Sequence, residues 1–69
     1  MKTMLRVTTV ECAGLAATGY IADTKENLDE VIKNFKEWNE PNGMLWVERV
    51  KVGLFKNKVL ETVIVLENE

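Results

Sequence analysis

The sequence of 69 residues contains no histidine and no serine. Nucleophilic catalysis by a Ser-His-Asp or Cys-His arrangement therefore cannot be built within one chain, and histidine-ligated metal sites are excluded as well. The single cysteine, Cys12, can form neither an internal disulfide nor a multi-cysteine metal site. We therefore expect no catalytic residues, no metal site and no cofactor, and we interpret Cys12 as a small buried hydrophobe.

Long apolar segments are also missing. No apolar run approaches the ~18 residues that a membrane-spanning helix requires. Thr8, Thr9 and Glu11 interrupt the N-terminal segment, where a secretory signal would carry its apolar region. We predict a cytoplasmic protein that does not associate with a membrane. Residues 1–69 are expected to form one small domain, which buries only about 60% of the surface that its unfolded chain exposes.

An excess of positive charge is lacking too, because the net charge is −2. A local basic cluster does occur near the C-terminal end, and its members are Arg49, Lys51, Lys56 and Lys58. Nucleic-acid binding would require such residues on one surface with aromatic partners, and only Trp46 and Phe55 are close in sequence. Lysines at a turn commonly serve solubility or prevent edge pairing. The sequence therefore disfavours a nucleic-acid partner.

The clearest predicted element is a helix from Thr24 to about Asn39. Its apolar residues follow one helical stripe and are Leu28, Val31, Ile32, Phe35 and Trp38. Asp23 with Glu26 has the spacing of a capping box, and Thr24 with Asn27 offers an alternative frame for the N-cap. Pro41 ends the helix, and Asn42 and Gly43 tolerate the positive φ of a turn.

Two segments after this turn predict a hairpin, since residues 44–55 and 59–67 are rich in β-branched and large apolar side chains. A two-residue turn at Asn57-Lys58 would place Val52 opposite Val63 and Val50 opposite Val65.

The N-terminal segment has two interpretations. Residues 4–12 are typical of a strand, and residues 18–22 can pair with them if Gly14-Leu15 forms a type II′ turn, which places Val10 opposite Gly19. The alternative is one strand followed by an irregular loop. We favour two hairpins, which gives a small α+β fold of order ββαββ: a four-stranded, mainly antiparallel sheet with one amphipathic helix on one face. The alternative is a three-stranded βαββ fold.

Both faces of the second hairpin carry large apolar side chains, whereas one helix about 10 Å wide cannot cover a sheet some 19 Å across. If the four valines face the helix, the opposite face presents Leu45, Val47, Phe55, Leu60, Ile64 and Leu66. This surface would exceed the apolar patch that soluble monomers usually expose. We therefore predict a homo-oligomer, with a dimer favoured, and assign these six residues to its interface. The alternative is that the first hairpin or the terminal residues cover this surface.

The segment ECAGLAATGY, residues 11–20, carries two glycines with the outer spacing of a phosphate-binding loop. No lysine follows Gly19, and Asp23 would place a carboxylate where the anion should bind. Nucleotide hydrolysis is therefore excluded, although small residues still permit close approach of a ligand or another chain. The candidate ligand-binding residues are Gly14, Gly19, Tyr20 and Trp46.

These observations predict a non-enzymatic binding protein that self-associates and acts through protein–protein contacts, as an accessory factor or inhibitor would. The alternative is a protein that binds or sequesters a small molecule, a nucleotide or metabolite, at a subunit interface. A weak enzyme built from carboxylates across a dimer interface is the least favoured hypothesis.

Overall fold

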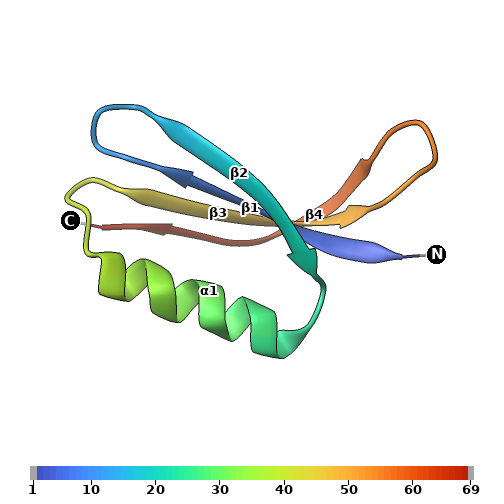
Figure 1. Cartoon of the computed structure of the whole chain (residues 1–69), viewed down its shortest axis with the longest axis horizontal. Helices are drawn as coiled ribbons and strands as arrows, with labels where there is room; N and C mark the ends of the chain where they lie inside the picture. The colour runs from blue at the N-terminus through green and yellow to red at the C-terminus, as the bar shows by residue number, and fades with distance from the viewer. Residues whose placement is uncertain (1, 69) are drawn as a thin grey trace.

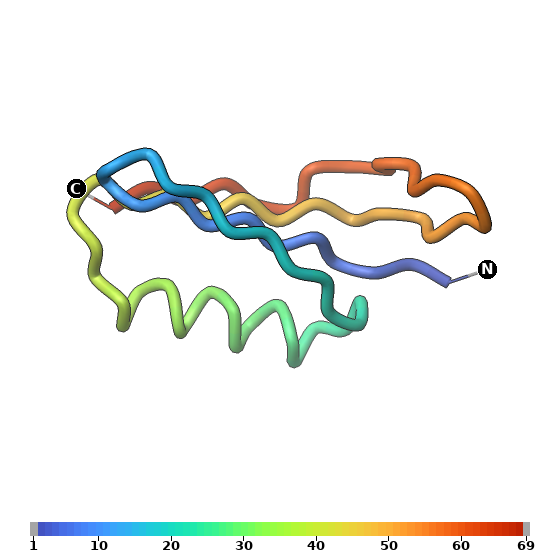
Figure 2. The backbone as a smooth tube through the Cα atoms, turned by 45° about the horizontal axis from the view of Figure 1, so that its top comes forward, coloured from blue at the N-terminus to red at the C-terminus, as the bar shows by residue number. Residues whose placement is uncertain are grey.

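The computed structural model describes residues 2–68, in which a sheet and a helix form two layers (Figures 1 and 2). The elements are β1 (Thr3–Val10), β2 (Ala16–Ala22), α1 (Lys25–Trp38), β3 (Met44–Lys51) and β4 (Lys58–Glu67). All strand pairs are antiparallel, and the order across the sheet is β2-β1-β3-β4. The predicted ββαββ fold is confirmed, with β2 in place of the alternative irregular loop.

Helix α1 is capped by a side chain at its start and by the backbone at its end. Thr24 is the N-cap, and its hydroxyl accepts a hydrogen bond from the backbone N–H of Asn27 at 3.1 Å. The predicted capping frame at Asp23 is therefore wrong, because the carboxylate of Asp23 binds Arg49 and Thr3 instead. At the other end, Asn39 adopts a φ of 50° and its N–H donates to the carbonyl of Phe35, which is a common way to satisfy the last carbonyls of a helix.

The β1–β2 hairpin closes through a loop of three residues, Cys12 to Gly14. The N–H of Gly14 donates to the carbonyl of Glu11, and the N–H of Glu11 donates to the carbonyl of Leu15. This pattern is a type I turn followed by a bulge, and it requires a left-handed residue at its third position; Gly14 has a φ of 85°. Gly19 consequently pairs with Val7 and not with Val10 as predicted, because the loop is one residue longer and is displaced along the chain.

The core lies between α1 and the two central strands. Leu5, Leu45 and Val47 are essentially inaccessible, and Phe35 of the helix packs on them. The partly buried side chains around them are Val7, Ile21, Leu28, Val31, Ile32, Val63, Ile64 and Leu66. The helix therefore covers the sheet over β1, β3 and β4.

The β3–β4 hairpin extends beyond the helix as a twisted arm (Figure 1). Its loop spans residues 52–57, which is longer than the predicted two-residue turn, and Val50 pairs with Val59 instead of Val65. Two register shifts leave Val63 and Leu60 without a partner on β3. Such bulges increase the local twist, so the sequence pattern alone could not give this register.

The predicted orientation of the second hairpin is wrong. The helix covers Leu45, Val47, Ile64 and Leu66, which had been assigned to an exposed interface. Val65 lies on the opposite face and is half exposed. Burying leucine and isoleucine removes more apolar area from water than burying valine does, and Leu45, Ile64 and Leu66 pack beneath the helix together with Val47 and Val63. Of the six residues predicted for the interface, only Phe55 and Leu60 are exposed.

We expect Leu45→Ala to lower the free energy of unfolding by about 2–5 kcal/mol, the usual cost of truncating a fully buried leucine. A chain of this length is expected to have only about 4–10 kcal/mol in total, so a large share of the stability would be lost. Urea denaturation followed by circular dichroism measures the change. Val65→Ala on the opposite face is the control and should cost less than about 1 kcal/mol; an equal cost for both variants would contradict the assigned core.

Candidate functional site

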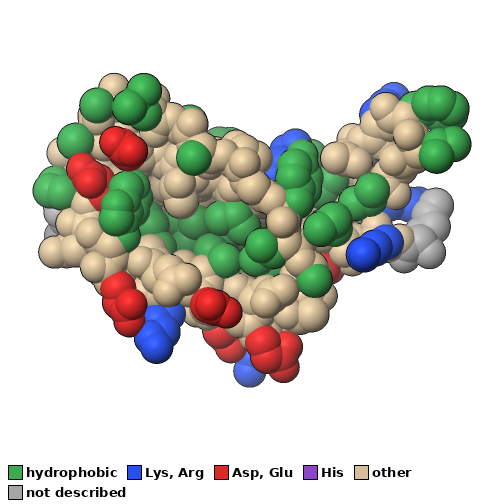
Figure 3. Space-filling view, viewed as in Figure 1, with side chains coloured by type: hydrophobic (Ala, Val, Ile, Leu, Met, Phe, Trp, Pro, Cys, Tyr) green, Lys and Arg blue, Asp and Glu red, His purple; other side chains and the backbone are tan. Residues whose placement is uncertain are grey.

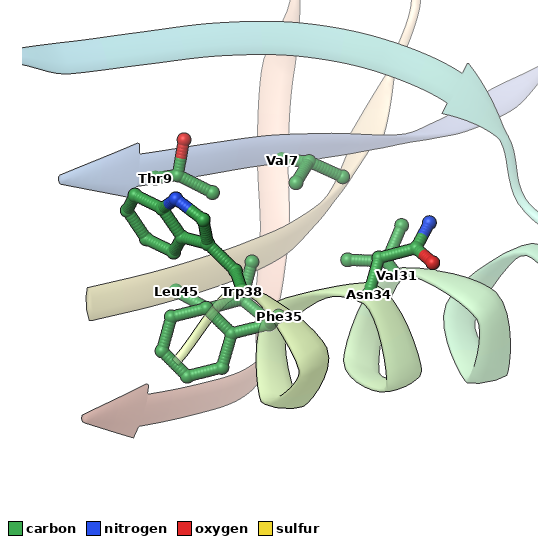
Figure 4. Close-up of a pocket in the computed structure, with 7 residues that line it drawn as sticks. All are labelled: Val7, Thr9, Val31, Asn34, Phe35, Trp38 and Leu45. Carbon is green, nitrogen blue, oxygen red and sulfur yellow. The ribbon is translucent and has the colours of Figure 1, made fainter. Parts of the chain in front are cut away.

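Each face of the sheet carries a hollow. On the helix side, an apolar cleft of about 290 Å³ opens between α1 and the sheet, and hydrophobic side chains gather there (Figure 3). The residues that line it come from β1, α1 and β3 and are Val7, Thr9, Val31, Asn34, Phe35, Trp38 and Leu45 (Figure 4). We call this hollow the apolar cleft.

The apolar cleft stays open because the neighbouring strand β2 presents small side chains toward it. Ala17 and Gly19 pair with Thr9 and Val7, which places them on the helix side of the sheet. A Cβ atom at Gly19 would have no other heavy atom within 4 Å. The helix-side surface of β2 around Ala17 and Gly19 is therefore left uncovered by α1, whereas Ile21 farther along the strand packs against the core.

Trp38 forms one wall of the apolar cleft. Its ring centroid lies 6.0 Å from that of Phe35, with the planes tilted by 54°, an arrangement that aromatic pairs favour. A Cβ atom at Gly43 would lie only 3.0 Å from the Trp38 ring, so any larger residue at this position would crowd the ring. Trp38 ends the apolar stripe of the helix, which predicts a buried side chain, but 40% of it is exposed.

The second hollow lies on the face of the sheet away from the helix, which we call the open face. It has a volume of about 390 Å³ and is lined by Arg6, Thr8, Thr18, Tyr20, Trp46 and Glu48. These six residues are named the aromatic patch. Tyr20 and Trp46, which belong to strands on either side of β1, are 44% and 45% exposed. Both rings therefore remain available for contact.

An ion pair occupies the middle of the aromatic patch. The guanidinium of Arg6 donates to the Glu48 carboxylate, with Nη2 at 2.7 Å and Nε at 2.9 Å from Oε1. The hydrogen bond to Glu48 raises the pKa of Arg6, and the neighbouring Tyr20 raises it further. Because the two charges cancel, the patch presents aromatic surface and hydroxyl groups and little net charge.

Asp23 joins the start of the helix to the sheet. Its Oδ2 accepts hydrogen bonds of 2.8 Å from both Arg49 Nε and the Thr3 hydroxyl. Arg49 also pairs with Glu61 of β4. Two residues of the basic cluster, Arg49 and Lys51, thus lie in β3, and the guanidinium of Arg49 is already paired within the chain.

The four predicted ligand-binding residues do not meet in one place. Tyr20 and Trp46 come together in the aromatic patch. Gly19 faces the helix side beside the apolar cleft, and Gly14 lies in the hairpin loop. Sequence reasoning missed Arg6 and Glu48, whose pairing depends on the β1–β3 register; opposite charges on candidate neighbouring strands were the available signal.

Cys12 is exposed, which corrects the prediction that it is buried. Its thiol donates to Glu40 Oε1 at 3.3 Å. This bond and the nearby charges of Glu40 and Glu11 raise the pKa of the thiol, so less reactive thiolate forms near neutral pH.

Comparison with known proteins returned no matching family model, no matching curated protein and no matching solved structure. Within residues 2–68, no helix has the length and apolar character needed to cross a membrane.

The Asp23 contacts predict a pH dependence of stability. The bonds from Arg49 and Thr3 lower the pKa of Asp23, so the stabilisation is present above the unfolded-state pKa of about 3.9 and is lost as the pH falls through the lower folded-state pKa. Asp23→Asn should therefore destabilise the protein at pH 7, with the difference from wild type shrinking below about pH 4. Thermal unfolding between pH 2 and pH 7 measures it.

Asp29→Asn removes a carboxylate from the exposed side of the same helix and is the matched control. We expect it to leave the unfolding temperature at pH 7 almost unchanged. A loss of stability equal to that of Asp23→Asn would contradict a specific role for the Asp23 contacts.

Proposed function

We propose that this chain is a cytoplasmic, non-enzymatic binding protein that self-associates and acts through contacts with another protein, as an accessory factor or inhibitor does. The observation that carries the proposal is the number of large apolar side chains at the surface of so small a chain. Tyr20 and Trp46 are exposed on the open face, and Leu54 and Phe55 are 90% and 95% exposed at the tip of the arm. Soluble monomers rarely expose such groups in contiguous patches.

The aromatic patch has the composition of a protein-binding surface. Tryptophan, tyrosine and arginine are the residue types that contribute most to binding energy at interfaces, and all three lie together here. The Arg6–Glu48 pair is already neutralised within the chain. The expected partner surface is therefore apolar with neutral hydrogen-bonding groups, and it has no strong charge of either sign.

The self-association is tested by light scattering during size-exclusion chromatography at micromolar concentration. We expect a mass that is a multiple of 7.9 kDa, with a dimer favoured because two-fold symmetry is the commonest form of homo-oligomer. A monodisperse monomer over the whole concentration range would contradict it.

The contact with another protein is tested by native mass spectrometry of protein purified gently from its own cells. The expected result is a stoichiometric protein partner, which Trp46→Ser should release. Lys33→Ala on the exposed side of the helix is the control and should retain the partner. A partner retained equally by both variants would contradict the assignment of the aromatic patch.

A second candidate function is small-molecule binding, which is favoured by the meeting of Tyr20 and Trp46 in one hollow. The two aromatic rings would stack on a flat polar ligand such as a nucleotide base. The hydroxyl groups of Thr8 and Thr18 would form hydrogen bonds with it. The same mass measurement separates the two functions. A retained metabolite with no protein partner would replace the leading proposal.

A further inference from the structure

The outer edge of β2 has no protection against pairing with another strand. Its seven residues, AATGYIA, carry no charge and no proline, and all except Ile21 are exposed. β2 is an edge strand, since β1 is its only neighbour in the described sheet. Proteins usually defend such edges with lysine, proline or bulges.

The opposite edge of the sheet, β4, has features that disfavour pairing with another strand. β4 carries charges at Lys58, Glu61 and Glu67, and its register shifts leave Leu60 and Val63 as unpaired bulged residues. Bulges and charges both oppose edge-to-edge pairing. The contrast within one sheet points to β2 as the edge that accepts another strand.

The hydrogen bonds of the β1–β2 hairpin determine which residues of β2 direct their backbone groups away from the sheet. The carbonyl of Leu15 accepts from Glu11 and therefore faces β1. Backbone groups alternate in direction along an antiparallel strand. The N–H and C=O groups of Ala17, Gly19 and Ile21 therefore also point toward β1. The residues between them direct their N–H and C=O groups away from the sheet, and Thr18 and Tyr20 are the central two.

The sequence of β2 is complementary to itself in this phase. An antiparallel pairing centred on Gly19 sets Thr18 opposite Tyr20 of the partner subunit, so the outward groups of both strands meet. The same register sets Ala17 opposite Ile21 of the partner subunit and Gly19 opposite Gly19 of the partner subunit. Small residues oppose large ones, and no charge opposes a like charge.

From these observations, we infer that two copies of this chain pair through β2, antiparallel and centred on Gly19, to form one continuous eight-stranded sheet. This inference rests on the proposed self-association and specifies its geometry. The two-fold axis is perpendicular to the sheet, so both helices lie on one side. The partner's β2 then extends the uncovered floor beside each apolar cleft, and the two aromatic patches adjoin on the open face.

The hydrogen bonds of the joined strands are tested with Thr18→Pro. Proline removes the outward N–H of residue 18 and leaves the hydrogen bonds to β1 intact, because proline is tolerated on an edge strand where the N–H faces solvent. We expect the dimer dissociation constant to rise at least tenfold by analytical ultracentrifugation, with the circular dichroism spectrum retained. Thr18→Val keeps the N–H and should remain dimeric. An unchanged dissociation constant in a folded Thr18→Pro protein would overturn the inference.

The register is tested by charges at the two-fold axis. A Cβ atom at residue 19 would have no other heavy atom of its own chain within 4 Å. In the dimer, residue 19 faces its own copy in a non-hydrogen-bonded pair, at a Cα separation of about 4.5 Å. Gly19→Lys and Gly19→Glu should each weaken the dimer several-fold through like-charge repulsion, whereas their equimolar mixture should associate more tightly than either alone. Gly19→Ala is the neutral control and should associate like wild type.

These outcomes separate the inference from the proposed function. If wild type associates but the mixed variants gain nothing over each alone, self-association stands and the β2 register is wrong. If wild type is monomeric at all concentrations, both fail.

Discussion

One helix is too narrow to cover a four-stranded sheet. The position of the core and of the exposed surfaces follows from this constraint. α1 packs over Leu5, Leu45 and Val47, and the partly buried side chains of β4 complete this layer. A helix is about 10 Å wide and strands lie about 4.8 Å apart, so most of one edge strand remains uncovered. That strand is β2: Ile21 near its end packs against the core, whereas the small residues Ala17 and Gly19 leave the apolar cleft open.

The helix and the number of strands were predictable because local patterns determine them. The apolar stripe ending at Trp38, the stop at Pro41 and the glycine at position 14 are signals that act within a few residues. The pairing register was not predictable in the same way. It depends on a three-residue loop at Cys12 and on bulges at Leu60 and Val63, and a small displacement at either changes every cross-strand partner.

The candidate site was predictable only in part for the same reason. Tyr20 and Trp46 were identifiable as unusual aromatic residues, and the structure brings them together. Packing, and no local sequence pattern, decides which face of the second hairpin meets the helix. Leu45 and Val47 are therefore core residues, although the sequence pattern predicted them at an interface. The proposed binding would use the surfaces that remain exposed: the aromatic patch, the arm tip at Phe55 and the edge of β2.

Amide hydrogen exchange along β2 tests the central claim, that the strand left uncovered by the helix pairs with its own copy. The amides of Ala17 and Gly19 face β1 and should be protected at every concentration. Those of Thr18 and Tyr20 face outward and should become protected only as the protein concentration rises through the range where light scattering detects association. Rapid exchange at Thr18 and Tyr20 in a fully associated sample would contradict the account.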